Sequence, residues 1–163
     1  MWICRVLFRK ELILFFLFTV NTLEAQEDKY LLKGIKSIGI VLEVFQPDMI
    51  ENGLSFESIK AKLELICRSN GIKISDGVGE GYLYVNINAL FREEPFPLAN
   101  YSYSLEFKQQ GTLIRNKKFF VGSTWSIGGV GYCSRNDFNN KIKEVILDKM
   151  DIFINEFLAV NKK

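Results

Sequence analysis

The feature that most constrains the fold is a strict alternation of apolar and other side chains in two segments. Residues 82–91 (YLYVNINALF) and residues 101–110 (YSYSLEFKQQ) both repeat with a period of two. This period is typical of β-strands, in which successive side chains point to opposite faces of a sheet. The alternation predicts antiparallel strands with one face against the core and the other face open. The residues expected to face the core are Leu83, Val85, Ile87 and Ala89 in the first segment and Tyr101, Tyr103, Leu105 and Phe107 in the second.

Three other segments are predicted strands, at residues 35–45, 72–75 and 118–126. In the last of these, the alternation places Trp125 in the core together with Phe119 and Val121.

Two segments have the spacing of amphipathic helices. The first follows Ser55, a favoured N-cap residue, and ends at Asn70-Gly71. The second spans residues 136–160. The intervening residues 46–54 and 128–134, which are rich in turn-forming residues, are expected to be loops.

The predicted order of elements is therefore β-α-β-β-β-β-α. Two helices with one apolar stripe each are the natural cover for a sheet with one apolar face. We expect an α+β fold of the two-layer α/β sandwich type, with a mostly antiparallel sheet and both helices on one face.

The open face of this sheet is a candidate interaction surface. Tyrosine and asparagine offer both contact area and hydrogen bonds to a protein or glycan partner. An ordinary solvated sheet face has the same pattern, so both interpretations stay open. The predicted face comprises Tyr82, Tyr84, Asn86, Asn88, Ser102 and Ser104, together with Glu106.

The first 25 residues have the order of a secretory signal peptide. Arg5, Arg9 and Lys10 precede an apolar run at residues 12–20, and residues 21–25 (NTLEA) end in a small residue. The run is shorter than the roughly 20 residues that a bilayer-spanning helix needs, so a permanent anchor is the less favoured alternative. We expect residues 1–25 to be cleaved, leaving residues 26–163 as one periplasmic or secreted α+β domain without a stable membrane span.

The composition excludes several classes of function. The chain contains no histidine, which removes Ser–His and Cys–His catalytic pairs and all histidine-ligated metal sites. Its 21 basic and 19 acidic residues are interspersed, so no basic stripe for nucleic acid is present. We predict no catalytic, cofactor-binding or metal-binding residue.

The expected function is that of an exported, non-catalytic interaction or envelope-associated module with a protein or glycan partner. The alternative is a carboxylate-based hydrolase acting on glycans.

Cys67 and Cys133 are the two cysteines of the predicted mature chain. If the strands alternate in direction after the first helix, both cysteines lie at the same end of the helical layer. An exported chain with two such cysteines is suited to a disulfide. The alternative is that Cys67 packs in the core as a free thiol.

Three short segments carry a resemblance to known proteins: residues 81–85 (GYLYV), 123–126 (STWS) and 157–162 (FLAVNK). They resemble a group of uncharacterised exported bacterial proteins. The strand–helix order is also similar to small envelope-assembly domains of the LPS-assembly lipoprotein and TolB amino-terminal type. Cys4 precedes the apolar run, so the chain lacks the lipid-accepting cysteine of the former. The resemblance implies an envelope-associated α/β domain and transfers no functional residue.

Overall fold

The protein is described by a computed structural model that covers residues 28–77 and 79–161. The predicted signal peptide, residues 1–25, lies outside the described residues. Within them, no helix combines the length and the apolar character that a membrane crossing requires.

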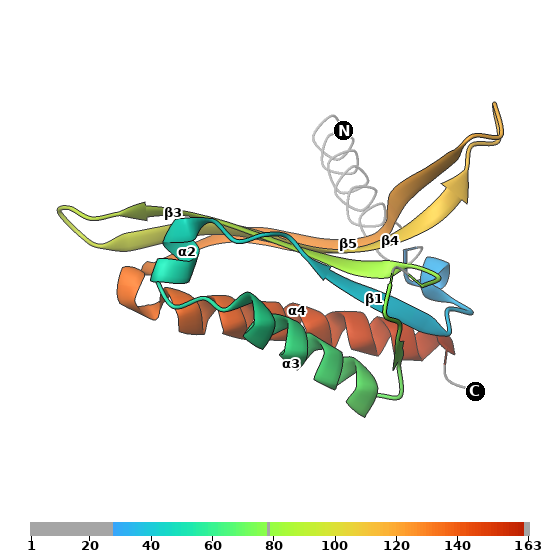
Figure 1. Cartoon of the computed structure of the whole chain (residues 1–163), viewed down its shortest axis with the longest axis horizontal. Coiled ribbons are helices and arrows are strands. Elements are labelled where there is room, and N and C mark those ends of the chain that lie inside the picture. The colour runs from blue at the N-terminus through green and yellow to red at the C-terminus, as the bar shows by residue number, and fades with distance from the viewer. Residues whose placement is uncertain (1–27, 78, 162–163) are drawn as a thin grey trace, which may run out of the picture.

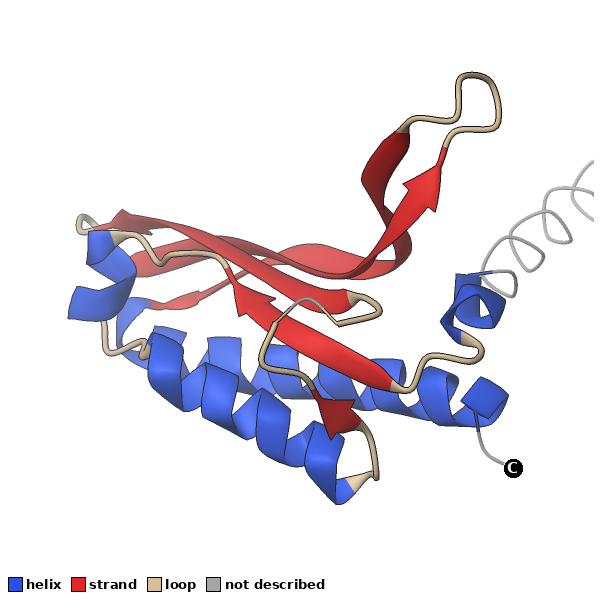
Figure 2. Ribbon diagram, turned by 45° about the vertical axis from the view of Figure 1, so that its right-hand side comes forward, coloured by secondary structure: helices blue, strands red, loops and turns tan. Residues whose placement is uncertain are grey.

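The described chain forms two layers, with a five-stranded sheet on one side and two long helices on the other (Figure 1). The strands are β1 (Ser37–Leu42), β2 (Lys73–Ile74), β3 (Tyr82–Arg92), β4 (Leu98–Thr112) and β5 (Phe119–Ser134). The helices are α3 (Phe56–Ser69) and α4 (Phe138–Asn161), with short turns at η1 (Asp28–Leu32), α2 (Pro47–Glu51) and η2 (Arg135–Asp137). Figure 2 shows both long helices on the same face of the sheet, which confirms the predicted α+β sandwich.

The strands lie in the order β2-β1-β3-β4-β5. The long ladders β3–β4 and β4–β5 are antiparallel, as predicted, whereas β1 is parallel to both β2 and β3. The expectation that strand directions alternate after the first helix is therefore wrong at β3.

The reason for this direction is the loop between β2 and β3, which crosses over β1. A β-carbon on Gly39 would lie 2.3 Å from the carbonyl oxygen of Gly77, so the loop backbone occupies the place of a side chain. The backbone N–H of Gly39 then donates to the carbonyl of Gly81 at 2.9 Å, which starts β3 on the other side of β1. Because the chain crosses β1 in this way, β3 begins at the same end of the sheet as β1 does.

Two segments that the sequence predicts to be loops form a short helix and part of a strand instead. Residues 46–54 contain the short helix α2, whose Met49 is fully buried. Residues 128–134 form the second half of β5. The rings of Tyr101 and Tyr103 on β4 lie over Gly131 and Gly129, and a β-carbon at either glycine would clash with the ring. Large side chains on β4 therefore fill the space that the β5 glycines leave, an arrangement known to rescue glycines in edge strands.

The core lies between the sheet and the helices. Ser55 caps α3, since its hydroxyl accepts a hydrogen bond from the N–H of Ser58 at 3.2 Å. The middle of the core is an aromatic cluster in which Phe153 of α4 lies 5.8 Å from Phe107 and 5.0 Å from Trp125, measured between ring centroids.

The prediction for Trp125 is confirmed, but that for Phe119 and Val121 is wrong. Trp125 is buried, whereas both other residues are exposed. The β4–β5 register shifts between Phe107, which pairs with Trp125, and Lys108, which pairs with Ser123. The extra, unpaired residue at this β-bulge shifts the alternation of β5 by one position. The side chains of the preceding residues of β5 therefore point to the face opposite to the one predicted.

Candidate functional site

The face of the sheet opposite the helices carries the six residues predicted to form an interaction surface. Their cross-strand pairs show this directly, because Asn86 lies opposite Ser104 and Asn88 lies opposite Ser102. The face continues onto β5, where Val130 lies opposite Ser102. Among the described residues, no helix covers this side of the sheet (Figure 2). The face divides into two halves with different properties.

The half nearest β1 is a polar network that satisfies its own hydrogen bonds. The Glu43 carboxylate accepts hydrogen bonds from the hydroxyl of Tyr84 and the side-chain amide of Asn86. The Lys108 ammonium lies 3.7 Å from the centroid of the Tyr84 ring and 3.6 Å from a carboxylate oxygen of Glu106. These contacts hold the side chains of this half in place.

The electrostatics of this network follow from the same bonds. The hydrogen bonds from Tyr84 and Asn86 lower the pKa of Glu43, because they stabilise its charged form. The bond to Glu43 raises the pKa of Tyr84, because the phenol must stay protonated to donate.

The half of the face farthest from β1 is apolar and exposed. Leu90 of β3 and the β5 residues Val130 and Tyr132 are 77%, 86% and 75% exposed. They surround a shallow hollow of about 610 Å³ that Asn88, Asn100 and Ser102 also line. We call these six residues the distal patch. An exposed apolar group with polar neighbours is typical of a protein interaction site.

The alternation in the sequence predicts only part of the distal patch. The alternation predicts that Asn88 and Ser102 lie on the open face. Leu90 continues the alternation of the same strand, so its position on this face could also be predicted. Val130 and Tyr132 were missed because the glycines around them predicted a loop. Only the pairing of β5 with β4 reveals that these two side chains belong to a sheet face.

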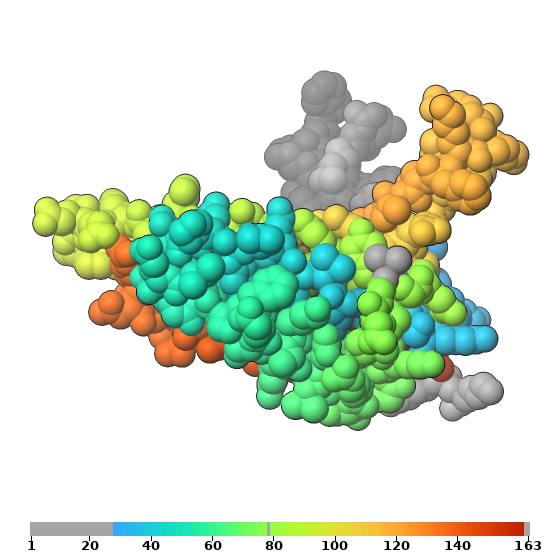
Figure 3. All heavy atoms as spheres, viewed as in Figure 1, coloured from blue at the N-terminus to red at the C-terminus, as the bar shows by residue number. Residues whose placement is uncertain are grey.

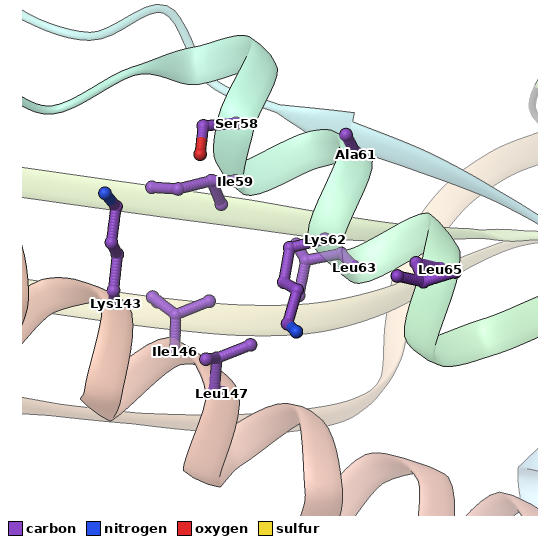
Figure 4. Close-up of a pocket in the computed structure, with 9 residues that line it drawn as sticks. All are labelled: Ser58, Ile59, Ala61, Lys62, Leu63, Leu65, Lys143, Ile146 and Leu147. Atoms are coloured by element: carbon purple, nitrogen blue, oxygen red, sulfur yellow. The ribbon is translucent and has the colours of Figure 1, made fainter. Parts of the chain in front are cut away.

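A second hollow lies between the two long helices, on the other side of the molecule. It has a volume of about 430 Å³, and its walls are mostly apolar. Figure 4 shows Ile59 of α3 and Ile146 of α4 facing each other across it, flanked by Lys62 and Lys143. No pattern in the sequence predicts this groove.

The two cysteines are both free, and the topology explains why. Cys67 ends α3 next to the start of β2, whereas Cys133 ends β5 at the opposite end of the sheet. The parallel direction of β3 reverses the expected directions of β4 and β5 and separates the thiols by roughly 30 Å along the strands. A disulfide needs Cα atoms within about 7 Å. The prediction that the cysteines share one end is therefore wrong, and the alternative of a buried free Cys67 is correct, since Cys67 is fully buried.

The Glu43 carboxylate lacks the property that the proton donor of a glycoside hydrolase needs. Such an enzyme requires one carboxyl group whose pKa is raised, so that it can donate a proton. Glu43 is exposed and its pKa is lowered instead. Glu93 is exposed and forms an ion pair with Arg135. Within the described residues, no group of three or more Asp, Glu or Cys side chains is placed to hold a metal ion.

Comparison with known proteins gives only remote similarity. Neither a protein-family model nor a curated protein sequence matches the chain. A solved structure of a minor lipoprotein from Acinetobacter baumannii is 11% identical with a TM-score of 0.41, and the match covers 78% of this chain and 93% of that one. A solved structure of a PelC dodecamer from Paraburkholderia phytofirmans is 11% identical with a TM-score of 0.39, covering 72% of this chain and 85% of that one. Similarity at this level carries no argument about function.

Proposed function

We propose that the chain is an exported, non-catalytic module that binds a protein partner in the cell envelope through the distal patch. The observation that carries the proposal is the exposure of Leu90, Val130 and Tyr132 on the open face of the sheet. Leu90 and Tyr132 flank Asn100 in one cross-strand row, and Val130 flanks Ser102 in the next. Exposed apolar side chains next to amide and hydroxyl groups match the composition of protein interfaces, in which tyrosine is enriched.

The edge of β5 adds a second support. β5 is the last strand of the sheet, and residues 119–134 contain neither a charged residue nor a proline. Natural sheets usually protect a long edge strand with charges, prolines or a β-bulge, and residues 126–134, which follow the bulge, have none of these. An extended segment of a partner can pair with such an edge while its side chains cover Val130 and Tyr132.

The partner is more consistent with a protein than with a glycan. Two of the three exposed apolar side chains are aliphatic, which suits a protein core contact better than a sugar ring. Tyr132 is the one aromatic ring exposed in the patch on which a sugar could stack.

The test compares two triple variants with matched residue types. Leu90→Gln/Val130→Thr/Tyr132→Ser removes the apolar part of the patch. Leu65→Gln/Ile50→Thr/Tyr30→Ser makes similar changes at side chains that are exposed on α3, α2 and η1. Both variants should keep the melting temperature of the parent protein, since exposed substitutions usually change stability by less than about 0.5 kcal/mol.

Photo-crosslinking in intact cells supplies the readout. A photoreactive phenylalanine analogue at position 132 or 130 should give a discrete crosslinked species, and the same analogue at position 30 or 50 should not. The crosslink at position 130 should disappear when Leu90→Gln and Tyr132→Ser are added. Crosslinks of equal yield at all four positions, or a crosslink that survives the patch substitutions, would refute the proposal. Binding of the purified protein to a glycan, lost in Tyr132→Ser and without any protein crosslink, would replace the protein partner by a sugar.

A further inference from the structure

The strands β4 and β5 continue past the rest of the sheet as a two-stranded arm. The last cross-strand pair between β3 and β4 is Tyr82 with Lys108, so from Gln109 onward β4 pairs only with β5. We call residues 109–122 the arm. Figure 1 shows it leaving the plane of the sheet at one end, and Figure 3 shows it projecting from the body of the molecule.

The arm bends away at the β-bulge. Thr124 has no partner across the ladder, and its hydroxyl accepts a hydrogen bond from the Gln109 side-chain amide at 2.7 Å. The same amide donates to the carbonyl of Leu31 in η1 at 3.0 Å. The base of the arm is thus fastened to the body, whereas no described residue forms a second layer over the arm beyond it.

The arm exposes apolar side chains that nothing in the described structure covers. Every residue from Thr112 to Val121 is exposed, and Ile114 and Phe119 are 88% and 83% exposed. The ring of Phe120 lies over Gly111 and Gly122 on one face of the arm. Because Phe119 and Val121 alternate with Phe120, they project from the other face. Neighbouring exposed apolar side chains are typical of binding surfaces.

The turn of the arm is cationic. The Leu113 N–H donates to the Lys118 carbonyl at 2.9 Å, and the Lys117 N–H donates to the Leu113 carbonyl at 2.8 Å. This closed turn presents Arg115, Lys117 and Lys118 to solvent. The sequence contains no aspartate or glutamate between Glu106 and Asp137, so no carboxylate of the arm neutralises these charges.

We propose that the tip of the arm binds the surface of a membrane that contains anionic lipids. Phenylalanine and isoleucine side chains lower their free energy by entering the boundary between headgroups and acyl chains, and lysine and arginine are attracted to anionic headgroups. A second copy of the chain fits this surface poorly. A symmetric contact would place the same cations of two arms together with no carboxylate between them. The membrane therefore suits both the apolar and the cationic side chains of the arm.

The first test measures the charge dependence of vesicle binding. The protein is purified as the cell produces it, so that all variants share one N-terminus, and is mixed with phosphatidylcholine vesicles with or without phosphatidylglycerol. We expect binding to increase with phosphatidylglycerol and to fall with salt. Lys117→Gln/Lys118→Gln should lower the partition coefficient about 30-fold, from about 1 kcal/mol per cation near an anionic surface. The control Lys73→Gln/Arg92→Gln removes two exposed cations outside the arm and should leave binding unchanged.

The second test measures insertion. Ile114→Ser/Phe119→Ser should reduce binding to phosphatidylglycerol vesicles by about tenfold or more, whereas Ile50→Ser/Phe96→Ser, at exposed positions elsewhere, should not. Phe119→Trp should shift its emission to the blue when vesicles are added. Equal binding to both vesicle types, no binding by the parent protein, or equal loss in arm and control variants would overturn the proposal. Binding to polyglutamate but not to vesicles would overturn it in favour of an acidic polypeptide partner.

Discussion

Removal of the Phe153 ring tests whether the aromatic cluster anchors the sheet to α4. Phe153 is fully buried, and its ring lies 5.0–5.9 Å from those of Phe107, Trp125 and Phe157, measured between centroids. Phe→Ala at a core position costs about 3–5 kcal/mol, and each aromatic pair contributes about 0.5–1.5 kcal/mol beyond the area it buries. With three aromatic neighbours, Phe153→Ala belongs in the upper part of that range, at about 4.5 kcal/mol.

Thermal unfolding followed by circular dichroism converts this value into a temperature. An unfolding entropy of about 2.1 cal/mol/K per residue, over about 130 described residues, gives roughly 0.3 kcal/mol/K. Phe153→Ala should therefore lower Tm by roughly 15 °C. Phe119→Ala deletes the same ring from an exposed position on the arm and should change Tm by less than about 2 °C. A shift below about 4 °C for Phe153→Ala, or comparable shifts for the two variants, would refute the assignment of the core.

Three further predictions concern the crossing loop, the thiol and the polar network. Gly39→Ala should cost about 1–3 kcal/mol in denaturant unfolding because its methyl group would meet the loop backbone, whereas Gly77→Ala, with open space around it, should cost less. Burial raises the pKa of the Cys67 thiol to about 12, so alkylation at neutral pH should label it only after unfolding; labelling in the native protein would contradict the structure. Because the pKa of Glu43 is lowered in the folded protein, its ionised carboxylate stabilises the fold at pH values above the pKa that Glu43 has in the unfolded chain. This stabilisation is lost as the pH falls through the pKa of Glu43 in the folded protein. Tyr84→Phe should raise the pKa of Glu43 in a carboxyl-carbon NMR titration, and an unchanged titration would show that the hydrogen bond does not form in solution.

The sequence predicts those parts of the fold whose signal is local. The alternation of residues 82–91 and 101–110 correctly assigns the faces of β3 and β4, because each side chain either enters the core or lies on the open face. The hydroxyl of Ser55 marks the start of α3 for a similarly local reason. The placement of both helices on one face follows from the single apolar face of the sheet.

The errors arise where a distant part of the chain decides the local structure. The direction of β3 depends on a loop that crosses β1 at Gly39, and a glycine in a predicted strand does not reveal what passes over it. The face to which Phe119 points depends on a bulge whose partner residues lie on another strand. Its exposure depends on the arm extending past β3, since residues 112–121 are exposed on both faces. The strand at residues 128–134 depends on Tyr101 and Tyr103, which cover its glycines from β4.

Two of these errors lie on β5, which also contributes residues to both proposed surfaces. Trp125 holds the middle of this strand to the helical layer, since its ring packs against Phe153 and its indole N–H donates to Glu156 of α4. On one side of Trp125 the strand forms half of the arm, and on the other side it supplies Val130 and Tyr132 to the distal patch. A strand that is fixed at its centre and paired with β4 along its length can expose apolar side chains at both ends without unfolding. The arrangement that makes β5 hard to recognise from sequence patterns therefore also lets it contribute exposed side chains to both proposed surfaces.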